Sequence, residues 1–244
     1  MLDPFFNIIF GFLLNWPPIF AILFLSAVIS VIIVGITKLF TDQKEMKRLK
    51  EELSGHQKKM KELKDDPEKM LEIQKKAMST NMQYMGKSMK STLFTFIPLL
   101  LIFGWMQGHF AYEPLAPGEP FTLKVILENG AAGNVSITVP EGLEVIGEPS
   151  WPITDHTVTF QLKGDSGDYF ATLSSNGQEV DKAITITTER KYAAITETYK
   201  SDVFKSAQLG NKTLKVFWKI SWFWAYLIFA MVFSIVLRKA IKVY

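Results

Sequence analysis

Long apolar runs alternate with charge-rich stretches along this chain, and the alternation predicts three membrane-spanning helices. A bilayer core needs about 20 mostly apolar residues in helical form. Three segments approach or reach this length, namely residues 19–37, 93–112 and 216–237. Tryptophan and lysine side chains stand near the ends of the first and third segments, as expected for interfacial anchors. The pattern therefore predicts an α-helical integral membrane protein.

A shorter apolar run, Phe5–Leu14, lies within the first 18 residues. It is too short to cross a bilayer, and prolines at positions 17 and 18 separate it from the first span. A helix lying in the outer interface is favoured over a re-entrant segment. Because no basic n-region or A-x-A site marks a cleaved signal peptide, we expect this segment to be retained.

Residues 38–92, between the first two spans, carry a helical repeat of apolar and charged positions. The first half places apolar or aromatic side chains at intervals of three and four, which is a heptad seam of Met46, Leu49, Leu53, His56, Met60 and Leu63. Asp65, Asp66 and Pro67 then supply a helix stop, an N-cap and a proline at the first helical position. A second helix with Leu71 and several methionines along one side is expected to about Lys90. Together these features predict an antiparallel coiled-coil hairpin.

Seven of the ten methionines of the chain fall within this hairpin. They could fill a narrow seam between the two helices. They could instead form an adaptable surface, since flexible and polarizable thioethers suit varied apolar partners. The candidates for such a surface are Met78, Met82, Met85 and Met89.

Residues 113–190 change to short runs of β type, separated by turn signals such as Asn129-Gly130 and Asn176-Gly177. Six or seven short strands over this length predict a small immunoglobulin-like β-sandwich. Residues 191–215 are interpreted as a helical or extended connector to the third span. The acidic side chains of this region are scattered over turns, so no catalytic constellation is indicated.

The distribution of charge predicts the orientation of the chain. The hairpin region has fourteen Lys or Arg against nine Asp or Glu, and three basic residues follow the third span. Residues 113–190 have four basic and twelve acidic residues. We therefore expect the hairpin and the tail 238–244 in the cytoplasm, with the N-terminus and the β domain outside a plasma membrane. The six lysines of residues 191–219 oppose this assignment, but long translocated domains largely escape the rule.

Hydroxyl side chains form stripes near the cytoplasmic ends of the predicted spans. They could serve helix packing through local or interhelical hydrogen bonds. They could also line a shallow groove open to the cytoplasm, with Ser26, Ser30, Thr37, Ser91, Thr92, Thr95 and Ser234 as candidates. No acid or base lies deep in a span, which argues against an ion pump or a proton relay. The chain has no cysteine, and its three histidines lie far apart, so we expect no metal, no cofactor and no enzymatic activity.

A span that runs into a basic helical hairpin and then a second span resembles the YidC/Oxa membrane-protein insertase superfamily. The stretches TKLFTDQKEMKRLKEEL (Thr37–Leu53), Met82–Met106 and SWFWAYLIFAMVFSIVLRKAIKVY (Ser221–Tyr244) are most similar to its archaeal YidC-like members. The resemblance covers the spans and the hairpin but not the β domain. Bacterial relatives have five core spans and an arginine in the groove. This chain has three spans and an uncharged first span, and Arg238 lies at a span end.

The resemblance implies a membrane-protein insertase or chaperone that helps nascent transmembrane segments enter the bilayer. The methionines would hold the client, and the groove would shorten the apolar distance that a polar segment must cross. Lipid, and a ribosome or targeting factor, are implied partners, without sequence-specific nucleic-acid binding. Candidates for electrostatic contact with membrane or ribosome are Lys44, Lys47, Arg48, Lys50, Arg238, Lys239 and Lys242.

Two other classes of protein stay open. A membrane-anchored adaptor would link a cytoplasmic partner to an outer one through the coiled coil and the β domain, and it would need no polar stripe within the membrane. An ion channel formed by oligomerisation is disfavoured, because the spans lack pore-lining charges.

Overall fold

The computed structural model describes residues 3–63 and 66–243, which form two compact units. The helical unit contains residues 3–9, 16–104 and 223–243 of the described chain. The β unit contains residues 10–15 and 105–222.

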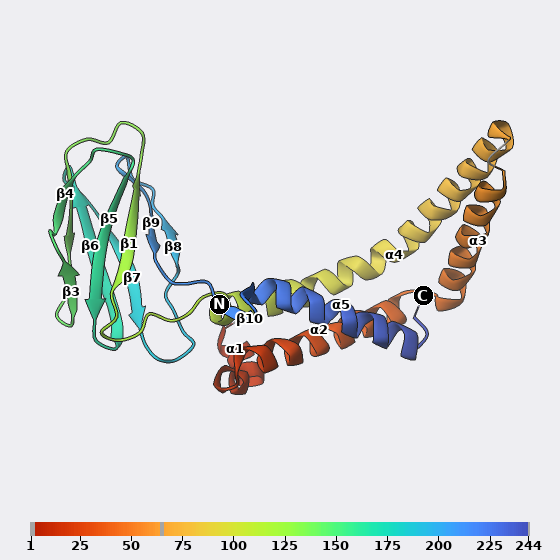
Figure 1. The fold of residues 1–244 in the computed structure, drawn as a ribbon, viewed down its shortest axis with the longest axis horizontal. Helices are drawn as coiled ribbons and strands as arrows, with labels where there is room; N and C mark the ends of the chain where they lie inside the picture. The colour runs from red at the N-terminus through yellow and green to blue at the C-terminus, as the bar shows by residue number, and fades with distance from the viewer. Residues whose placement is uncertain (1–2, 64–65, 244) are drawn as a thin grey trace. The chain divides into compact units, whose positions relative to one another are not determined.

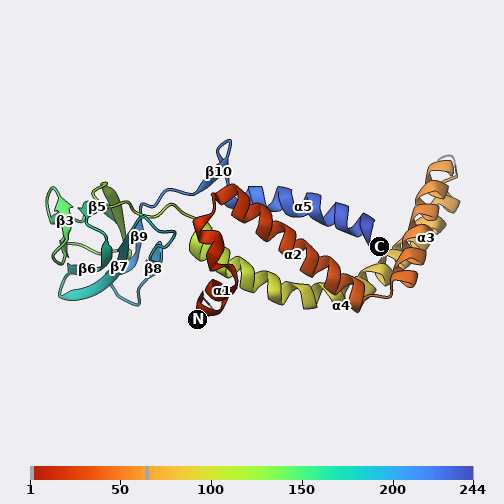
Figure 2. The same ribbon diagram turned by 90° about the horizontal axis from the view of Figure 1, so that it is seen from below.

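Within the described residues, three helices are long and apolar enough to cross a membrane. They are α2 (Pro18–Phe40), α4 (Pro67–Phe110) and α5 (Trp222–Ala240). Aromatic side chains join them, since Phe40 of α2 stacks on Phe94 of α4 at 4.4 Å, and Phe103 of α4 meets Tyr226 of α5 at 4.6 Å between ring centroids. Figure 2 shows the three helices running alongside one another. The prediction of three apolar helices is confirmed.

The helix boundaries differ from the predicted spans at the second and third helices. The second span is not a separate helix, because α4 continues from the hairpin for 44 residues with Pro98 inside it. The third begins at Trp222 instead of residue 216, because β10 (Lys215–Phe217) pairs with β11 (Ile220–Ser221). Trp218 and Lys219 form the turn of this small hairpin with φ angles of 45° and 68°. Hydropathy alone could not reveal a turn that lacks glycine and asparagine.

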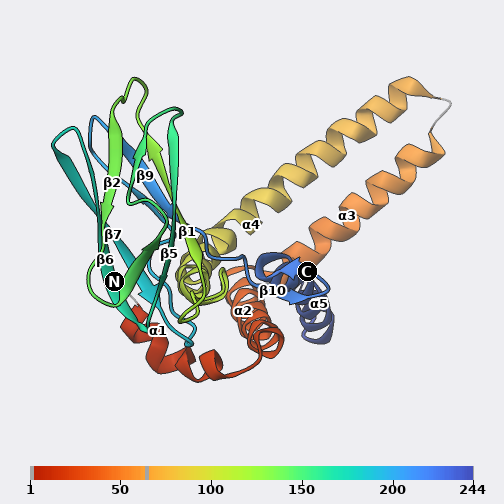
Figure 3. The same ribbon diagram turned by 60° about the vertical axis from the view of Figure 1, so that its left-hand side comes forward.

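The segment between α2 and α4 is a helical hairpin, in which α3 (Gln43–Glu62) lies beside the first half of α4 (Figure 3). Asp42 caps α3 by accepting hydrogen bonds from the backbone N–H groups of Lys44 and Glu45. Asp66 caps α4 in the predicted way, since its Oδ1 accepts from the Lys69 N–H at 3.2 Å, one residue before Pro67. Asp65, the predicted stop, lies outside the described residues.

The inner faces of the hairpin agree with the sequence pattern on α3 and depart from it on α4. The five predicted seam positions on α3, and Leu63 at its C-cap, are buried or half-buried, with Met46 and Leu49 the most buried. On α4 the inward positions are instead Met70, Ile73, Ala77, Thr80 and Tyr84. Thr80 donates a hydrogen bond across the hairpin to Glu52 at 3.2 Å. The methionine row is therefore not the seam, while coiled-coil geometry itself stays a prediction.

The N-terminal segment forms α1 (Asp3–Phe10) and the 3-10 helix η1 (Gly11–Asn15). Leu13 is fully buried, and Phe10 meets Trp105 at 5.6 Å between ring centroids within the β unit. Phe5 and Ile8 of α1 are exposed. This exposure is compatible with the predicted interfacial location, which stays a prediction.

The β unit is a two-sheet sandwich (Figure 1). One sheet has the order β3-β5-β1-β9-β8 and the other β4-β2-β6-β7. The strand bounds are β1 Phe121–Leu127, β2 Asn134–Thr138, β3 Leu143–Ile146, β4 Ser150–Pro152, β5 Thr157–Gly164, β6 Gly167–Ser175, β7 Gln178–Ile186, β8 Thr196–Thr198 and β9 Phe204–Leu209. Alternating side chains, such as Leu123, Phe160 and Leu173, point into a shared core. A β-sandwich-like domain is thus confirmed in the C-terminal part.

The sandwich extends beyond its predicted end at residue 190. Residues 191–215 were interpreted as a connector, yet they contain β8 and β9, and β9 pairs along β1 inside the sheet. Phe204 and Ala207 are fully buried in the core. The alternation in FKSAQL is short and follows a lysine-rich stretch, so local pattern did not distinguish a strand from a linker.

The chain enters and leaves the sandwich through adjacent, hydrogen-bonded segments. The Glu113 N–H donates to the Lys212 carbonyl at 2.8 Å, and the Leu214 N–H donates to the Ala111 carbonyl at 3.0 Å. Tyr192 also contacts the end of α4, where its hydroxyl donates to the Gln107 carbonyl and accepts from the Ala111 N–H. The last turns of α4 are therefore part of the β unit.

Candidate functional site: a polar pocket between apolar helices

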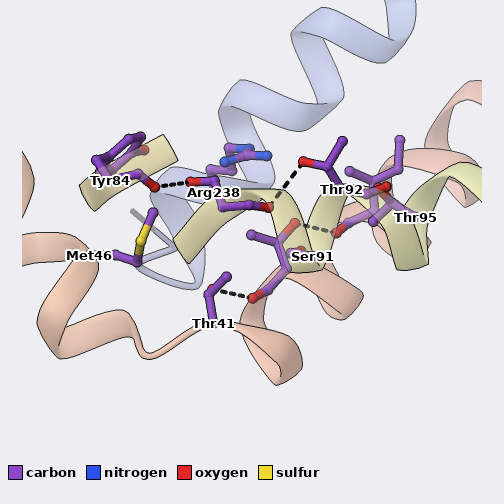
Figure 4. A pocket seen from close by; sticks show the side chains of 10 residues that line it. Thr41, Met46, Tyr84, Ser91, Thr92, Thr95 and Arg238 are labelled. Atoms are coloured by element: carbon purple, nitrogen blue, oxygen red, sulfur yellow. Dashed lines mark hydrogen bonds between the residues drawn. The ribbon is translucent and has the colours of Figure 1, made fainter. Parts of the chain in front are cut away.

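A polar pocket of about 200 Å³ lies among the helices of the helical unit. Its wall comes from α2, α3, α4 and α5 and from the loop after α2, and Figure 4 draws the lining side chains and labels seven of them. The lining residues are Ile33, Thr37, Thr41, Met46, Tyr84, Ser88, Ser91, Thr92, Thr95 and Arg238. We refer to this site as the polar pocket.

Most hydroxyls of the polar pocket donate to carbonyls of their own helix. Ser88 donates to Tyr84, Thr92 to Ser88 and Thr95 to Thr92, over 2.8–3.1 Å. These bonds satisfy the hydroxyl hydrogens and leave oxygen lone pairs as acceptors. Water or a polar peptide segment in the pocket would therefore meet hydrogen-bond acceptors in an otherwise apolar helical environment.

Arg238 adds a positive charge to this wall. It lies in the last turn of α5, is half-buried, and its Nε donates to Ser234 Oγ at 3.4 Å. A guanidinium has five N–H donors, so this bond leaves other donors available to a ligand. The pocket thus combines hydroxyl acceptors with one strong donor group.

The structure brings four of the seven candidate groove residues together and places three elsewhere. Thr37, Ser91, Thr92 and Thr95 line the polar pocket. Ser26 and Ser30 are buried instead against α5, where their hydroxyls lie 3.4 and 3.2 Å from the Tyr226 and Ala230 carbonyls. Ser234 is not in the wall but accepts the bond from Arg238.

Several pocket residues were not among the sequence candidates. Thr41 comes from the loop after α2 and Met46 from α3, so they reach the pocket only because the chain folds back after Phe40. Tyr84 follows the inward row of α4, which could have been found from its spacing with Ala77 and Thr80. Arg238 was predicted as an electrostatic contact, and no sequence signal placed its side chain beside Thr92 and Thr95.

The four candidate methionines lie on the outer side of the hairpin. Their exposed fractions are 67% for Met78, 66% for Met82, 56% for Met85 and 60% for Met89. With 100° between successive residues, all four lie within a sector of about 60° on α4. We call this surface the methionine face.

The predicted electrostatic residues separate into two groups. On α3, Arg48 binds Glu45 at 2.9 Å and Glu52 at 3.2 Å, and Lys47 lies 3.7 Å from Glu51. The Arg48 guanidinium holds the pKa of Glu45 below its ordinary value by hydrogen bonding to the carboxylate. Lys44 is exposed on the same helix. The remaining four line a second pocket, and one of them, Arg238, also lines the polar pocket; they are Lys50, Arg238, Lys239 and Lys242.

Three apolar helices around a hydroxyl-lined pocket, together with a charged helical hairpin, define a multi-pass membrane protein with a polar site among its helices. The sequence model of the integral membrane protein EMC3/TMCO1-like family matches residues 7–139, and the chain belongs to this family. The match covers α2, α3 and α4 and ends in the β domain, after β2. No curated protein and no solved structure matches the chain.

The family relates the chain to membrane-protein insertion and biogenesis in general terms, because EMC3 belongs to the Oxa1/YidC/Alb3 superfamily. The predicted resemblance to YidC and Oxa is therefore supported at the level of that superfamily. Membership of its archaeal YidC-like group stays a prediction.

Proposed function

We propose that this protein helps nascent transmembrane segments enter the bilayer from the cytoplasmic side, with the methionine face receiving the segment. The observation that carries the proposal is an exposed apolar surface that continues along one helix. Phe96 and Leu100 lie in the same sector of α4 as the methionine face, and Leu93 lies about 20° beyond its edge; their exposed fractions are 53%, 53% and 66%.

This continuous surface suits a client that moves from water into lipid. Methionine side chains adapt to apolar partners of different shape, and large exposed apolar patches mark interaction sites. Because no loop interrupts α4 between Met89 and Leu93, an apolar segment bound to the methionine face could slide along the same helix into the membrane. The transfer of its apolar surface out of water would supply the driving force.

The polar pocket supports the same proposal from the side of the polar flanks of a client. A charged side chain at the bilayer centre costs about 2.5–3.5 kcal/mol on insertion scales. The hydroxyls of Ser91, Thr92 and Thr95, together with Arg238, give such a flank hydrogen-bonding groups within the helical unit. We propose that the pocket opens to the cytoplasm, in keeping with the basic residues around it.

Photocrosslinking tests the client contact. A photoreactive residue is placed at Met82 or Met85 and, as a matched control, at Lys87, which is exposed on the opposite side of α4 about 180° from Met78. Stalled nascent chains with and without an apolar segment are then presented to the full-length protein in membranes.

Crosslinks from positions 82 and 85, but not from 87, that require the apolar segment would support the proposal. Probes that react with lipid or with one fixed protein, and never with the nascent chain, would contradict it and favour the adaptor.

A further inference from the structure

A second pocket of about 480 Å³ lies at the C-terminal end of α5 and collects four basic side chains. Its lining residues are Lys50 of α3, Tyr84 of α4, Ile235, Arg238 and Lys239 of α5, and Lys242 and Val243 beyond its end. No acidic side chain is in this wall among residues 3–63 and 66–243. We call it the basic pocket.

The last turn of α5 places these cations by a specific backbone arrangement. The Val243 N–H donates to the Arg238 carbonyl at 3.0 Å, and Lys242 adopts a φ of 52°. This is the Schellman pattern, in which glycine normally occupies the left-handed position. A lysine there is less favourable than glycine. Lys242 therefore keeps a positive side chain in the basic pocket although its backbone conformation is unfavourable. Unfavourable backbone conformations of this kind cluster at functional sites.

Arg238, Lys239 and Lys242 lie within five residues of one another at the end of α5, and an anion in the pocket would reduce their mutual repulsion. The partial negative charge at the C-terminus of α5 offsets part of it. The chemistry of the wall, with ammonium groups and a guanidinium, suits a phosphate group.

An apolar stripe leads along α5 to this pocket. Ile228, Val232 and Ile235 share one face of the helix with Lys239, within about 60°. Their exposed fractions are 40%, 53% and 62%. The order along the helix is therefore an apolar track followed by cations, which matches an acyl chain followed by a phosphate. A free phosphate compound or an RNA backbone has no acyl chain that could lie along the apolar stripe.

We propose that the basic pocket binds the phosphate headgroup of an anionic phospholipid whose acyl chain lies along Ile228, Val232 and Ile235. Bound lipid would fix the end of α5 beside the polar pocket, because Tyr84 and Arg238 belong to both walls.

Native mass spectrometry of the full-length protein in detergent tests this site. The protein is titrated with phosphatidylglycerol and, separately, with phosphatidylcholine of the same acyl chains. We expect the wild type to prefer phosphatidylglycerol. The double variant K239Q/K242Q should bind it about 25-fold more weakly, since each lysine near an anionic lipid surface contributes about fivefold. The matched control K87Q/K90Q removes the same charge from exposed positions outside the pocket and should retain the preference.

A second variant separates binding from folding. Lys242→Gly removes one cation but relieves the left-handed conformation, so it should raise thermal stability while weakening phosphatidylglycerol binding about fivefold. Equal binding of the two lipids by the wild type, or an equal loss in K87Q/K90Q, would overturn the proposal. Complete displacement of the lipid by glycerol phosphate would also overturn the proposal. The same holds if the protein binds a short RNA duplex and shows no preference between the two lipids.

Discussion

At the scale of single residues, the hydroxyls of the polar pocket and the buried serines of α2 have different roles, although the sequence grouped them. Thr92 and Thr95 bond to their own helix and line the pocket. Ser26 is fully buried beside the Tyr226 carbonyl of α5. The sequence shows only that hydroxyls recur near one end of the spans. The side on which each lies depends on how α2 packs against α5.

Substitution should distinguish these two roles. Ser26→Leu should destabilise the helical unit by about 1–3 kcal/mol, since it adds volume to a filled contact. The pair T92V/T95V keeps the side-chain shape, so it should leave unfolding by denaturing detergent nearly unchanged but reduce insertion of clients with polar flanks. A T92V/T95V protein with full insertion activity would show that the pocket hydroxyls are dispensable.

Arg238 should matter most for clients with an acidic flank. Arg238→Gln should lower their insertion about tenfold, which corresponds to about 1.4 kcal/mol, near the lower end for a hydrogen bond to a charged group. Clients with a neutral flank should be less affected. Reconstituted insertion assays would measure both, and R238K is the control that keeps the charge and its effect on orientation. Equal loss with both kinds of client would contradict a direct contact.

Burial of Lys182 should make the free energy of unfolding of the β unit depend on pH in the alkaline range. Its side chain is fully buried, and its Nζ donates to the Ala194 carbonyl and to Glu197 at 3.1 Å. Burial lowers the pKa of Lys182, and the hydrogen bond to Glu197 offsets only part of this effect. The folded protein therefore releases this proton at lower pH than the unfolded chain. The free energy of unfolding should rise, relative to K182M, as pH increases towards the ordinary lysine pKa of about 10.4.

Denaturant unfolding of the full-length protein across this pH range would measure the difference. Lys163→Met is the control, since Lys163 pairs with Glu144 at 3.0 Å on an exposed surface. A pH-independent difference for K182M would show that Lys182 keeps its ordinary pKa.

At the scale of elements, the hairpin shows how far periodicity can predict packing. On α3 a single apolar row exists, and it is the inward face. On α4 two rows of side chains could form the inward face. The methionine row is more hydrophobic than the row that contains Ala77 and Thr80. The row that contains Ala77 and Thr80 packs inward, which leaves the methionine face exposed. Hydrophobicity ranked the two rows wrongly, because small and hydroxyl-bearing side chains also allow helices to approach closely.

The junction between α4 and the sandwich depends on Tyr192. Burial raises the pKa of its phenol to about 12, so the hydroxyl is protonated at neutral pH and donates to the Gln107 carbonyl. Tyr192→Phe would leave this carbonyl and the Ala111 N–H without that partner. Ala111 is buried and Gln107 is exposed, so the cost of about 1–3 kcal/mol for an unpaired buried group falls on the Ala111 N–H. Hydrogen exchange of the Ala111 amide should become faster.

Tyr199→Phe is the matched control for this change. It removes a hydroxyl that donates to the Asp181 carbonyl at 3.0 Å, away from α4. Unchanged exchange at Ala111 in the Tyr192→Phe variant would show that the junction does not need this side chain.

At the scale of the whole molecule, the distribution of charge predicts the orientation of the chain in the membrane. The chain has no cysteine, so single cysteines can report it. Asp155 of the β domain and Lys58 of α3 are exposed. A membrane-impermeant maleimide should label D155C on intact cells and K58C only after permeabilisation. The reverse pattern would place the acidic domain inside and contradict the proposed cytoplasmic pocket.

The sequence predicted the main elements of the molecule, but it did not predict the segments that connect them. Apolar length predicted the three helices, and alternation predicted a sandwich. The strands β8 and β9 were not predicted because their alternating pattern is short. The turn at Trp218 and Lys219 was not predicted because it lacks the usual turn residues. The pocket depends on contacts among four helices, which no local pattern encodes.

The uninterrupted course of α4 has a mechanical consequence. A helix of 44 residues measures about 66 Å, more than twice the roughly 30 Å of a bilayer core. The part that carries the methionine face and the part that crosses the membrane have no joint between them up to Pro98. Tilting or twisting the hairpin would therefore turn the embedded part as a lever turns about its pivot. Capturing a client and displacing the helix that borders its path into lipid would then be a single movement.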